Sequence, residues 1–272
     1  MSNLLTRAIT GFFFAIVIIG SILLGSEIQA LAFGLFLVLG LNEYVSLFKD
    51  TEYKQSQIVS VFLGTIIYCS FVVSGFFKLN YEILFSLIFV STFLVFLIEI
   101  WRKQKLPLLA ISVFVFGIVY LVIPFILMYK LVDEKISSFS PLLGMILLIW
   151  ANDTFAYLFG RKIGKTPLFK RISPKKTWEG TIAGILLTIV TSGILSFSTP
   201  ENDTLFWLIS GIIVAPCAIF GDLLESLFKR SMDIKDSGNI LPGHGGILDR
   251  FDAVLFTVPF FYLWHLVYQQ IV

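Results

Sequence analysis

Long apolar runs separated by short polar joints dominate the chain. Lipid offers the backbone no hydrogen-bond partner, so a spanning segment is a helix of about 20 mostly apolar residues. Joints as short as Gly25–Gln29 make neighbouring helices antiparallel. The pattern predicts an all-α polytopic integral membrane protein with about nine transmembrane helices, at Ile9–Leu24, Ala30–Phe48, Ile58–Phe77, Ile83–Trp101, Leu108–Tyr129, Leu142–Phe159, Gly180–Phe197, Leu205–Phe228 and Phe251–Gln270.

Composition supports a membrane protein. Of 272 residues, 57% are hydrophobic and 14% are charged, whereas about 25% are charged in an ordinary soluble domain. The net charge of +2 gives no basic excess that would indicate a nucleic-acid partner. Cys69 and Cys217 lie far apart in apolar runs, which favours small core residues over a disulfide or a thiolate metal site.

The basic residues predict an orientation. With nine spans, 17 of the 20 Lys and Arg residues fall at the amino terminus and in the even-numbered loops. Positive charge favours the cytoplasmic side. We therefore expect a protein of the cytoplasmic (inner) membrane with its amino terminus inside and its carboxyl terminus outside. The first span lacks a convincing cleavage site, so we expect it to be retained.

The distribution of charges also suggests that the two halves of the chain have different roles. Residues 1–141 are predicted to form amino-terminal transmembrane helices, about five spans, of mostly lipid-like sequence with charges in the joints. Residues 142–272 read as a catalytic transmembrane region of about four spans, with cytoplasmic loops at 160–179 and 229–250. Chemistry is therefore expected in the second region.

The first polar loop follows Asn152-Asp153-Thr154 and carries seven Lys and Arg residues between Arg161 and Lys176. Such a loop is typical of a membrane anchor that contacts anionic lipid. Its interleaved glycines and the run Ser173-Pro174-Lys175-Lys176-Thr177 also suit a phosphate cradle, since glycine lets backbone amides approach an anion. The spacing is not that of a nucleotide-binding P-loop.

Ionisable residues line one face of the eighth span. Asp222, Glu225, Ser226 and Lys229 are spaced i, i+3, i+4 and i+7. Charges within a span are costly and normally face a partner or a wet cavity. An internal Glu225–Lys229 pair would leave Asp222 unpaired, and a carboxylate is a natural ligand of Mg²⁺.

The stretch Ser226–Asp252 holds further polar residues, with Asp249 and Asp252 opening the ninth span. If this loop folds back, Asp249 meets Asp222, and two carboxylates share a cation beside cationic side chains. That arrangement suits transfer at a phosphorus centre. His244 alone is more typical of a hydrogen-bonded loop residue than of a base.

This stretch resembles the signature of the phosphatidate cytidylyltransferases, also called CDP-diacylglycerol synthases. It matches at every defined position: Ser226, Phe228-Lys229-Arg230, Lys235-Asp236, Gly238, Leu241-Pro242, His244-Gly245-Gly246-Ile247 and Asp249-Arg250-Phe251-Asp252. Asn152-Asp153-Thr154 and the run Ser173–Gly180 are similar to the family as well, so strong resemblance covers about Trp150 to Asp252. The first five spans resemble it only in hydropathy and in Glu43 of the second span.

The resemblance implies Mg²⁺-dependent conversion of CTP and phosphatidate into CDP-diacylglycerol and pyrophosphate, a step of phospholipid biosynthesis. We assign Mg²⁺ to Asp222 and Asp249, and the resemblance also allows a second, monovalent cation there. Second-rank ligands or orienting groups are Asp252, Asp236 and Asp153. Expected phosphate contacts are Lys175, Lys176, Lys229, Arg230 and Lys235; further candidates for CTP or phosphate binding are Ser173, Thr177, Asn152, Ser226, His244, Gly245, Gly246 and Arg250.

Alternatives remain at this stage. A membrane ion or solute transporter would also place acids within spans, although it would be expected to spread them near mid-bilayer. The helix motif of the CDP-alcohol phosphotransferases is absent from the sequence. Gly180 and Gly184 suit helix packing within one chain or between two, so a homodimer stays open.

Overall fold

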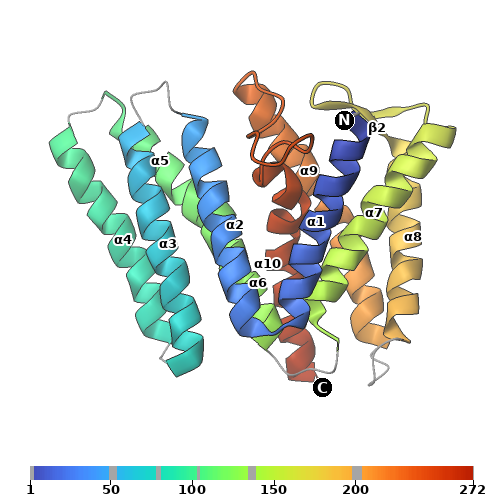
Figure 1. Ribbon diagram of the computed structural model, residues 1–272, viewed down its shortest axis with the longest axis horizontal. Helices are drawn as coiled ribbons and strands as arrows, with labels where there is room; N and C mark the ends of the chain where they lie inside the picture. The colour runs from blue at the N-terminus through green and yellow to red at the C-terminus, as the bar shows by residue number, and fades with distance from the viewer. Residues whose placement is uncertain are drawn as a thin grey trace. The chain divides into compact units, whose positions relative to one another are not determined.

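The computed structural model describes residues 3–48, 54–77, 81–102, 105–133, 139–197 and 204–271. Within these ranges the chain is almost entirely helical (Figure 1). The helices are α1 (Asn3–Leu23), α2 (Ser26–Ser46), α3 (Lys54–Phe77), α4 (Tyr81–Arg102), α5 (Pro107–Gly117), α6 (Ile123–Asp133), α7 (Pro141–Ile163), α8 (Trp178–Ser196), α9 (Thr204–Ser231) and α10 (Leu248–Ile271). A π-helical turn, η1 (Ile118–Val122), joins α5 to α6 without a break.

The predicted all-α membrane architecture is confirmed. Each of the nine apolar runs forms a helix, and most helices extend a few residues into the flanking polar sequence because a helix satisfies its own backbone hydrogen bonds in water as well as in lipid. Within the described ranges, eight helices are long and apolar enough to cross a bilayer. Among the described residues, α4 is helical over 22 residues but is not one of these eight.

The chain divides into two compact units. The first comprises residues 1–129 and 237–248, and the second comprises residues 130–236 and 249–272. The segment Ser237–Leu248, which precedes α10, thus belongs with the amino-terminal helices. This division follows contacts within the chain, so the catalytic role expected for residues 142–272 stays a prediction.

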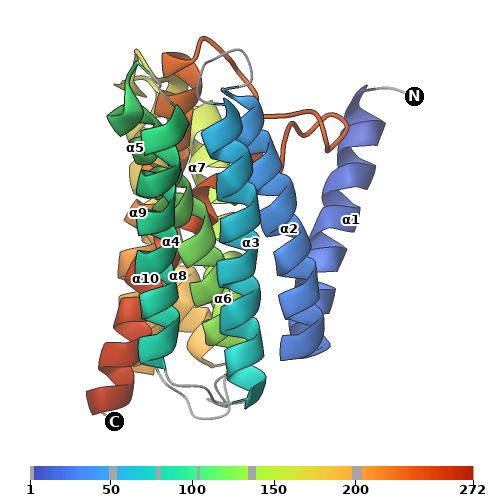
Figure 2. The same ribbon diagram turned by 90° about the vertical axis from the view of Figure 1, so that its left-hand side faces the viewer.

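Helices of the first unit pack through aromatic and small residues. In both ribbon views α2 lies beside α3 (Figure 2). Tyr68 of α3 donates a hydrogen bond to the Ala30 carbonyl oxygen at 2.9 Å, and Tyr44 of α2 donates to the Val113 carbonyl oxygen at 2.7 Å. Cys69 is exposed on α3, so the expectation that it is a core residue was wrong; it extends from a helix face that other helices leave uncovered.

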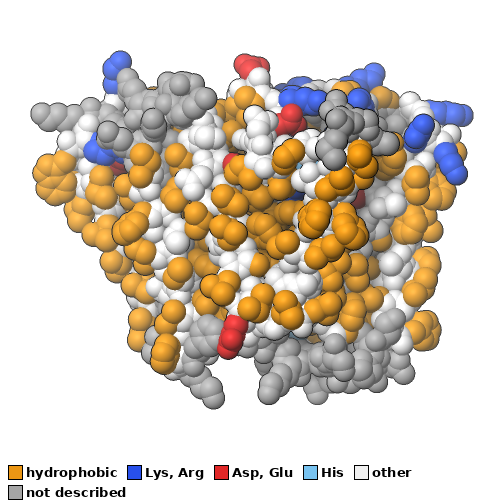
Figure 3. Space-filling view, in the orientation of Figure 1, with side chains coloured by type: hydrophobic (Ala, Val, Ile, Leu, Met, Phe, Trp, Pro, Cys, Tyr) orange, Lys and Arg blue, Asp and Glu red, His pale blue; other side chains and the backbone are white. Residues whose placement is uncertain are grey.

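In the second unit α7 packs mainly against α8, and α8 packs against α9 (Figure 1). The loop between α7 and α8 contains a small antiparallel hairpin of β1 (Pro167–Phe169) and β2 (Ser173–Thr177), which the hydropathy pattern does not predict. On the face in Figure 3, hydrophobic side chains cover the middle of these helices, and Lys and Arg gather over the upper end of α7 and the hairpin. This distribution is typical of helices that cross a membrane.

Candidate active site

The hairpin is fixed to the start of α8 by its own side chains. The Glu179 carboxylate accepts hydrogen bonds from the backbone N–H groups of Lys165, at 3.0 Å, and Thr166, at 3.2 Å. Thr177 caps α8, because its Oγ1 accepts from the Gly180 N–H at 3.3 Å. The basic loop is therefore a shaped structure, as its glycines and hydroxyl residues suggested.

Small residues let α7 and α8 approach closely. A Cβ atom placed on Gly180 would lie 2.6 Å from the Ala156 carbonyl oxygen and 2.7 Å from Gly160 Cα. A Cβ atom on Gly184 would lie 3.0 Å from Ala156 Cβ. In this structure Gly180 and Gly184 therefore serve packing within one chain, which accounts for their spacing without a second copy.

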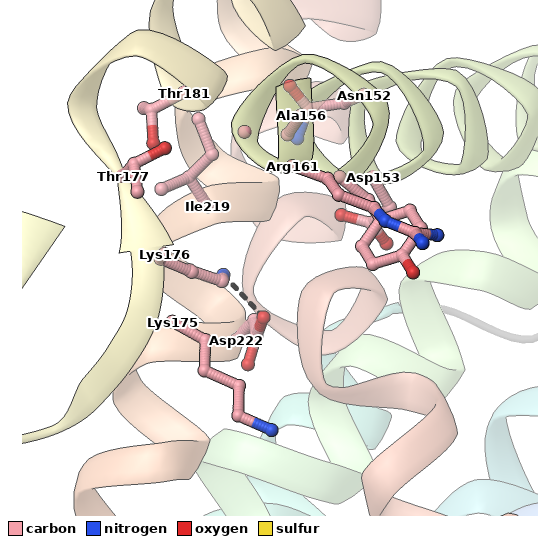
Figure 4. Close-up of a pocket in the computed structure, with 12 residues that line it drawn as sticks. Asn152, Asp153, Ala156, Arg161, Lys175, Lys176, Thr177, Thr181, Ile219 and Asp222 are labelled. Atoms are coloured by element: carbon pink, nitrogen blue, oxygen red, sulfur yellow. Dashed lines mark ion pairs between the residues drawn. The ribbon is translucent and has the colours of Figure 1, made fainter. Parts of the chain in front are cut away.

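A pocket of about 360 Å³ opens where the hairpin meets the helices (Figure 4). This is within the range of small-molecule sites. Lys176 reaches from β2 toward Asp222 of α9, and the two side chains form an ion pair. The pocket is lined by Asn152, Asp153, Ala156, Tyr157, Gly160 and Arg161 of α7, Lys175, Lys176 and Thr177 of β2, Thr181 of α8, and Ile219 and Asp222 of α9.

Asn152 is the most deeply buried polar residue of this lining, with 1% of its surface exposed. Within the described part of the chain, neither its Nδ2 nor its Oδ1 atom has a hydrogen-bond partner of normal geometry. A buried amide without partners is costly, because it has lost its water. Its position makes it available to a ligand that presents both a donor and an acceptor.

A second cluster of charges lies where α9 ends and α10 begins. The Lys229 ammonium donates to Glu225 Oε2 at 2.8 Å and to Asp249 Oδ1 at 2.6 Å. All three side chains are at least 86% buried. The helices approach closely at Gly221, where a Cβ atom would lie 2.7 Å from the Asp252 carbonyl oxygen. Folding thus brings Asp249 to α9, where it contacts Lys229; the expected meeting of Asp249 with Asp222 stays a prediction.

The pocket and the α9–α10 cluster gather several of the predicted residues. Asn152, Asp153, Lys175, Lys176, Thr177 and Asp222 line the pocket, and Ser226 donates to Asp222 Oδ1 at 3.3 Å. Asp252 is within electrostatic range of Asp222, Asp153 and Glu225. Ser173 is half-buried on β2, and the remaining predicted residues of this unit, Arg230, Lys235, Asp236 and Arg250, are exposed. Arg230 donates to the Ile234 carbonyl oxygen at 3.1 Å.

The predicted residues His244, Gly245 and Gly246 lie in the first unit. A Cβ atom on Gly11 of α1 would lie 3.2 Å from His244 Nε2, so this side chain packs against α1. Glu43 of α2 contacts the same loop through the Ile247 and Leu248 N–H groups, a contact that the residue-level reasoning did not predict. The only feature of the sequence that pointed to Glu43 was its resemblance to a glutamate of the family.

The donors of the pocket fit a magnesium ion. Among the described residues no three His, Cys, Asp or Glu side chains form a metal cluster. Mg²⁺, however, is usually bound by one or two carboxylates together with water and phosphate oxygens. Asp222, with 33% of its side chain exposed, meets that requirement, and the Lys176 ammonium already occupies a cation position beside it.

These helices define a multi-pass integral membrane protein, and its pocket is lined by three basic residues, Arg161, Lys175 and Lys176. Residues 5–268 match the model of the Cytidylyltransferase family. The chain therefore belongs to the cytidylyltransferase family.

Curated relatives agree with this assignment. The phosphatidate cytidylyltransferase of Staphylococcus saprophyticus is 38% identical over 175 residues, which cover 64% of this chain and 66% of the relative. The phosphatidate cytidylyltransferase of Staphylococcus aureus is 37% identical over 176 residues, with the same coverage. The match thus spans just under two thirds of these relatives, and the resemblance found in the sequence is confirmed at the level of the family.

Proposed function

We propose that the protein transfers the cytidylyl group of CTP to phosphatidate, releasing pyrophosphate and forming CDP-diacylglycerol. The observation that carries this proposal is the pocket at the hairpin, where Lys176 and Asp222 face a cavity of about 360 Å³ in a multi-span membrane protein. The names of the relatives support the same reaction. The site would let a water-soluble nucleotide meet a lipid whose acyl chains stay in the bilayer.

The reaction needs charge neutralisation more than an activated nucleophile. An anionic phosphatidate oxygen forms a bond to the α-phosphorus of CTP, and the bond from that phosphorus to the oxygen bridging to the β-phosphate breaks. Pyrophosphate leaves with the electron pair. Two polyanions must approach each other, so Lys175, Lys176 and Arg161 would offset their repulsion. Lys229, Arg230, Lys235 and Arg250 remain proposed contacts outside the pocket lining.

We assign Mg²⁺ first to Asp222, with Asp249 as its proposed second ligand. When bound, such an ion neutralises phosphate oxygens and the leaving pyrophosphate. Asp153 faces the same pocket, and Asp252 is within electrostatic range of Asp222, so both keep their second-rank role. Three further proposals rest on the sequence alone: a metal-binding or orienting role for Asp236, a second cation that is monovalent, and a homodimer.

Asn152 is the proposed reader of the cytosine base. Cytosine presents an amino donor beside a ring-nitrogen acceptor, and a carboxamide offers the complementary pair. The two buried atoms without partners support this role. Tyr157, an exposed aromatic residue of the same lining, is placed to cover the base.

Two matched substitutions test the proposal. We expect Asp222→Asn and Asp249→Asn each to abolish most CTP-dependent CDP-diacylglycerol formation by purified protein in detergent. Asp233→Asn is the control, since Asp233 is exposed, lies outside the pocket lining and has a φ of 53° that asparagine also tolerates. Turnover near that of the wild type in both site variants would refute the metal assignment; no CTP-dependent product from the wild type would refute the reaction.

The cytoplasmic orientation is a proposal that depends on α4 crossing the membrane. In a variant without Cys69 and Cys217, we expect Lys170→Cys in the hairpin to react with an impermeant maleimide only after the cells are opened. Gln270→Cys at the end of α10 should react in intact cells. Three helices, α8, α9 and α10, separate the two positions whether or not α4 crosses. Reaction of Lys170→Cys together with protection of Gln270→Cys in intact cells would therefore overturn the predicted orientation.

A further inference from the structure

The segment Ser237–Leu248 folds into a tight loop that glycines make possible. Leu241 N–H donates to the Gly245 carbonyl oxygen at 2.9 Å, and His244 N–H donates to the Leu241 carbonyl oxygen at 2.9 Å. Gly243 and Gly245 have φ values of 74° and 81°, which side chains disfavour. These local bonds shape the tip of the loop but do not attach it to a helix.

Two helices provide that attachment: Arg7 of α1 donates from Nε to the Gly243 carbonyl oxygen at the tip, and Glu43 of α2 binds both ends of the segment. Its Oε1 atom accepts from the Ile247 N–H at 2.9 Å, and its Oε2 atom accepts from the Leu248 N–H at 3.0 Å and from Ser237 Oγ at 3.4 Å. One carboxylate therefore joins both ends of the segment. Glu43 is 4% exposed, so these bonds are formed away from water.

The space around this carboxylate explains two further glycines. A Cβ atom on Gly246 would overlap Glu43 Oε2, and one on Gly238 would lie 2.6 Å from Oε1. Real Cβ atoms do not approach an oxygen so closely, so a side chain at either position would displace the carboxylate. The loop backbone closes around Glu43 from two sides.

The two backbone donors stand at the beginning of α10, which starts at Leu248. The first N–H groups of a helix have no partner within it, and a carboxylate there is also favoured by the helix dipole. Glu43 thus caps α10 from a different helix. Asp249, the proposed metal ligand, is the next residue of the chain.

We propose that Glu43 is a positioning residue for catalysis: it holds the Ser237–Leu248 loop, up to the residue at which α10 begins, in the conformation that the reaction needs. This inference rests on the proposed function. Glu43 acts through the loop backbone, and its carboxylate has no role in binding either substrate.

The first test combines kinetics with amide exchange in Glu43→Gln. Glutamine has one acceptor oxygen, so one of the two N–H groups would face an amide NH₂ group instead. We expect the deuterium exchange of the Ile247 and Leu248 amides to accelerate by about tenfold or more, since a bond to a charged acceptor is lost. We expect kcat to fall by roughly tenfold to a hundredfold, with a smaller change in KM for CTP.

The control is Glu99→Gln, which removes another buried carboxylate of the same unit. Glu99 pairs with Arg102 at 2.7 Å on α4, so its loss should leave loop exchange and kcat of the folded protein close to wild type. Glu43→Asp keeps the charge with a shorter reach and should recover part of kcat. Unchanged loop exchange, or a kcat loss that merely follows the unfolded fraction, would overturn the proposal.

A double-mutant cycle makes the test independent of either single variant. Gly246→Ala alone should lower kcat, because the new methyl group displaces the carboxylate. In a Glu43→Ala background the methyl group no longer overlaps the carboxylate and meets the Ser237 hydroxyl, which can rotate away, so the same substitution should have a smaller effect. Strictly additive losses would contradict the proposed contact. Because amide exchange needs no substrate, the inference about the loop can fail or hold separately from the proposed reaction.

Discussion

Replacing Lys229 by methionine distinguishes two roles for this lysine. The sequence suggests a phosphate contact, whereas in the structure the ammonium joins Glu225 Oε2 and Asp249 Oδ1 at 2.8 and 2.6 Å. Its side chain is 14% exposed, and those of the two carboxylates are 7% and 5% exposed. Lys229→Met keeps most of the side-chain volume and leaves two buried carboxylates without their cation.

The expected cost is large because the carboxylates stay behind. Removing one partner of a buried ion pair typically costs about 3–5 kcal/mol. For a chain of this size that corresponds to a decrease in Tm on the order of 10 °C. Thermal unfolding in detergent, followed by tryptophan fluorescence, measures it. Adding Glu225→Gln to Lys229→Met should recover part of the loss, since it removes one of the two stranded charges.

The exposed Lys170 of the hairpin supplies the matched control, and Lys170→Met should leave the Tm near its wild-type value. A phosphate contact alone would give a different pattern for Lys229→Met: unchanged Tm, with a raised KM for one substrate. That result would refute the reasoning that Lys229 chiefly holds Asp249 against α9.

Two further predictions concern the pocket and its walls. Gly180→Ala should destabilise the protein by about 1–3 kcal/mol, because the new methyl group would overlap the Ala156 carbonyl oxygen and Gly160. The control is Gly193→Ala, whose new methyl group would lie 3.5 Å from its nearest neighbour and should leave the Tm in thermal unfolding close to wild type. Asn152→Leu should leave the Tm unchanged or raise it, because it removes a buried amide that has no hydrogen-bond partner of normal geometry. The same substitution should lower the preference for CTP over UTP in competition assays. A preference equal to that of the wild type would exclude base recognition by Asn152.

The sequence predicted the helices well, but only some of the side-chain contacts around the candidate site, for physical reasons. Spanning helices follow from hydropathy alone, because lipid leaves the backbone no alternative. Helical spacing alone placed Asp222, Ser226 and Lys229 on one face of α9. Pairings between distant segments were not visible: Lys176 meets Asp222 only because the hairpin folds over the end of α9, and hydropathy carries no information on that fold.

The structure gives α1 and α2 a role that hydropathy concealed. Arg7 of α1 donates to the Gly243 carbonyl oxygen at 2.8 Å, and Glu43 of α2 accepts from Ile247 and Leu248. The loop therefore belongs structurally to the amino-terminal helices, although it is read in sequence as part of the catalytic region. We infer that two physical constraints shape the family pattern of Ser226–Asp252. Its acids and lysines form the charged contacts, whereas Gly238 and Gly246 leave space for the Glu43 carboxylate and Gly243 and Gly245 allow the positive φ values of the loop. A glutamate in an otherwise apolar span thus carries information about the site even though it need not contact a ligand.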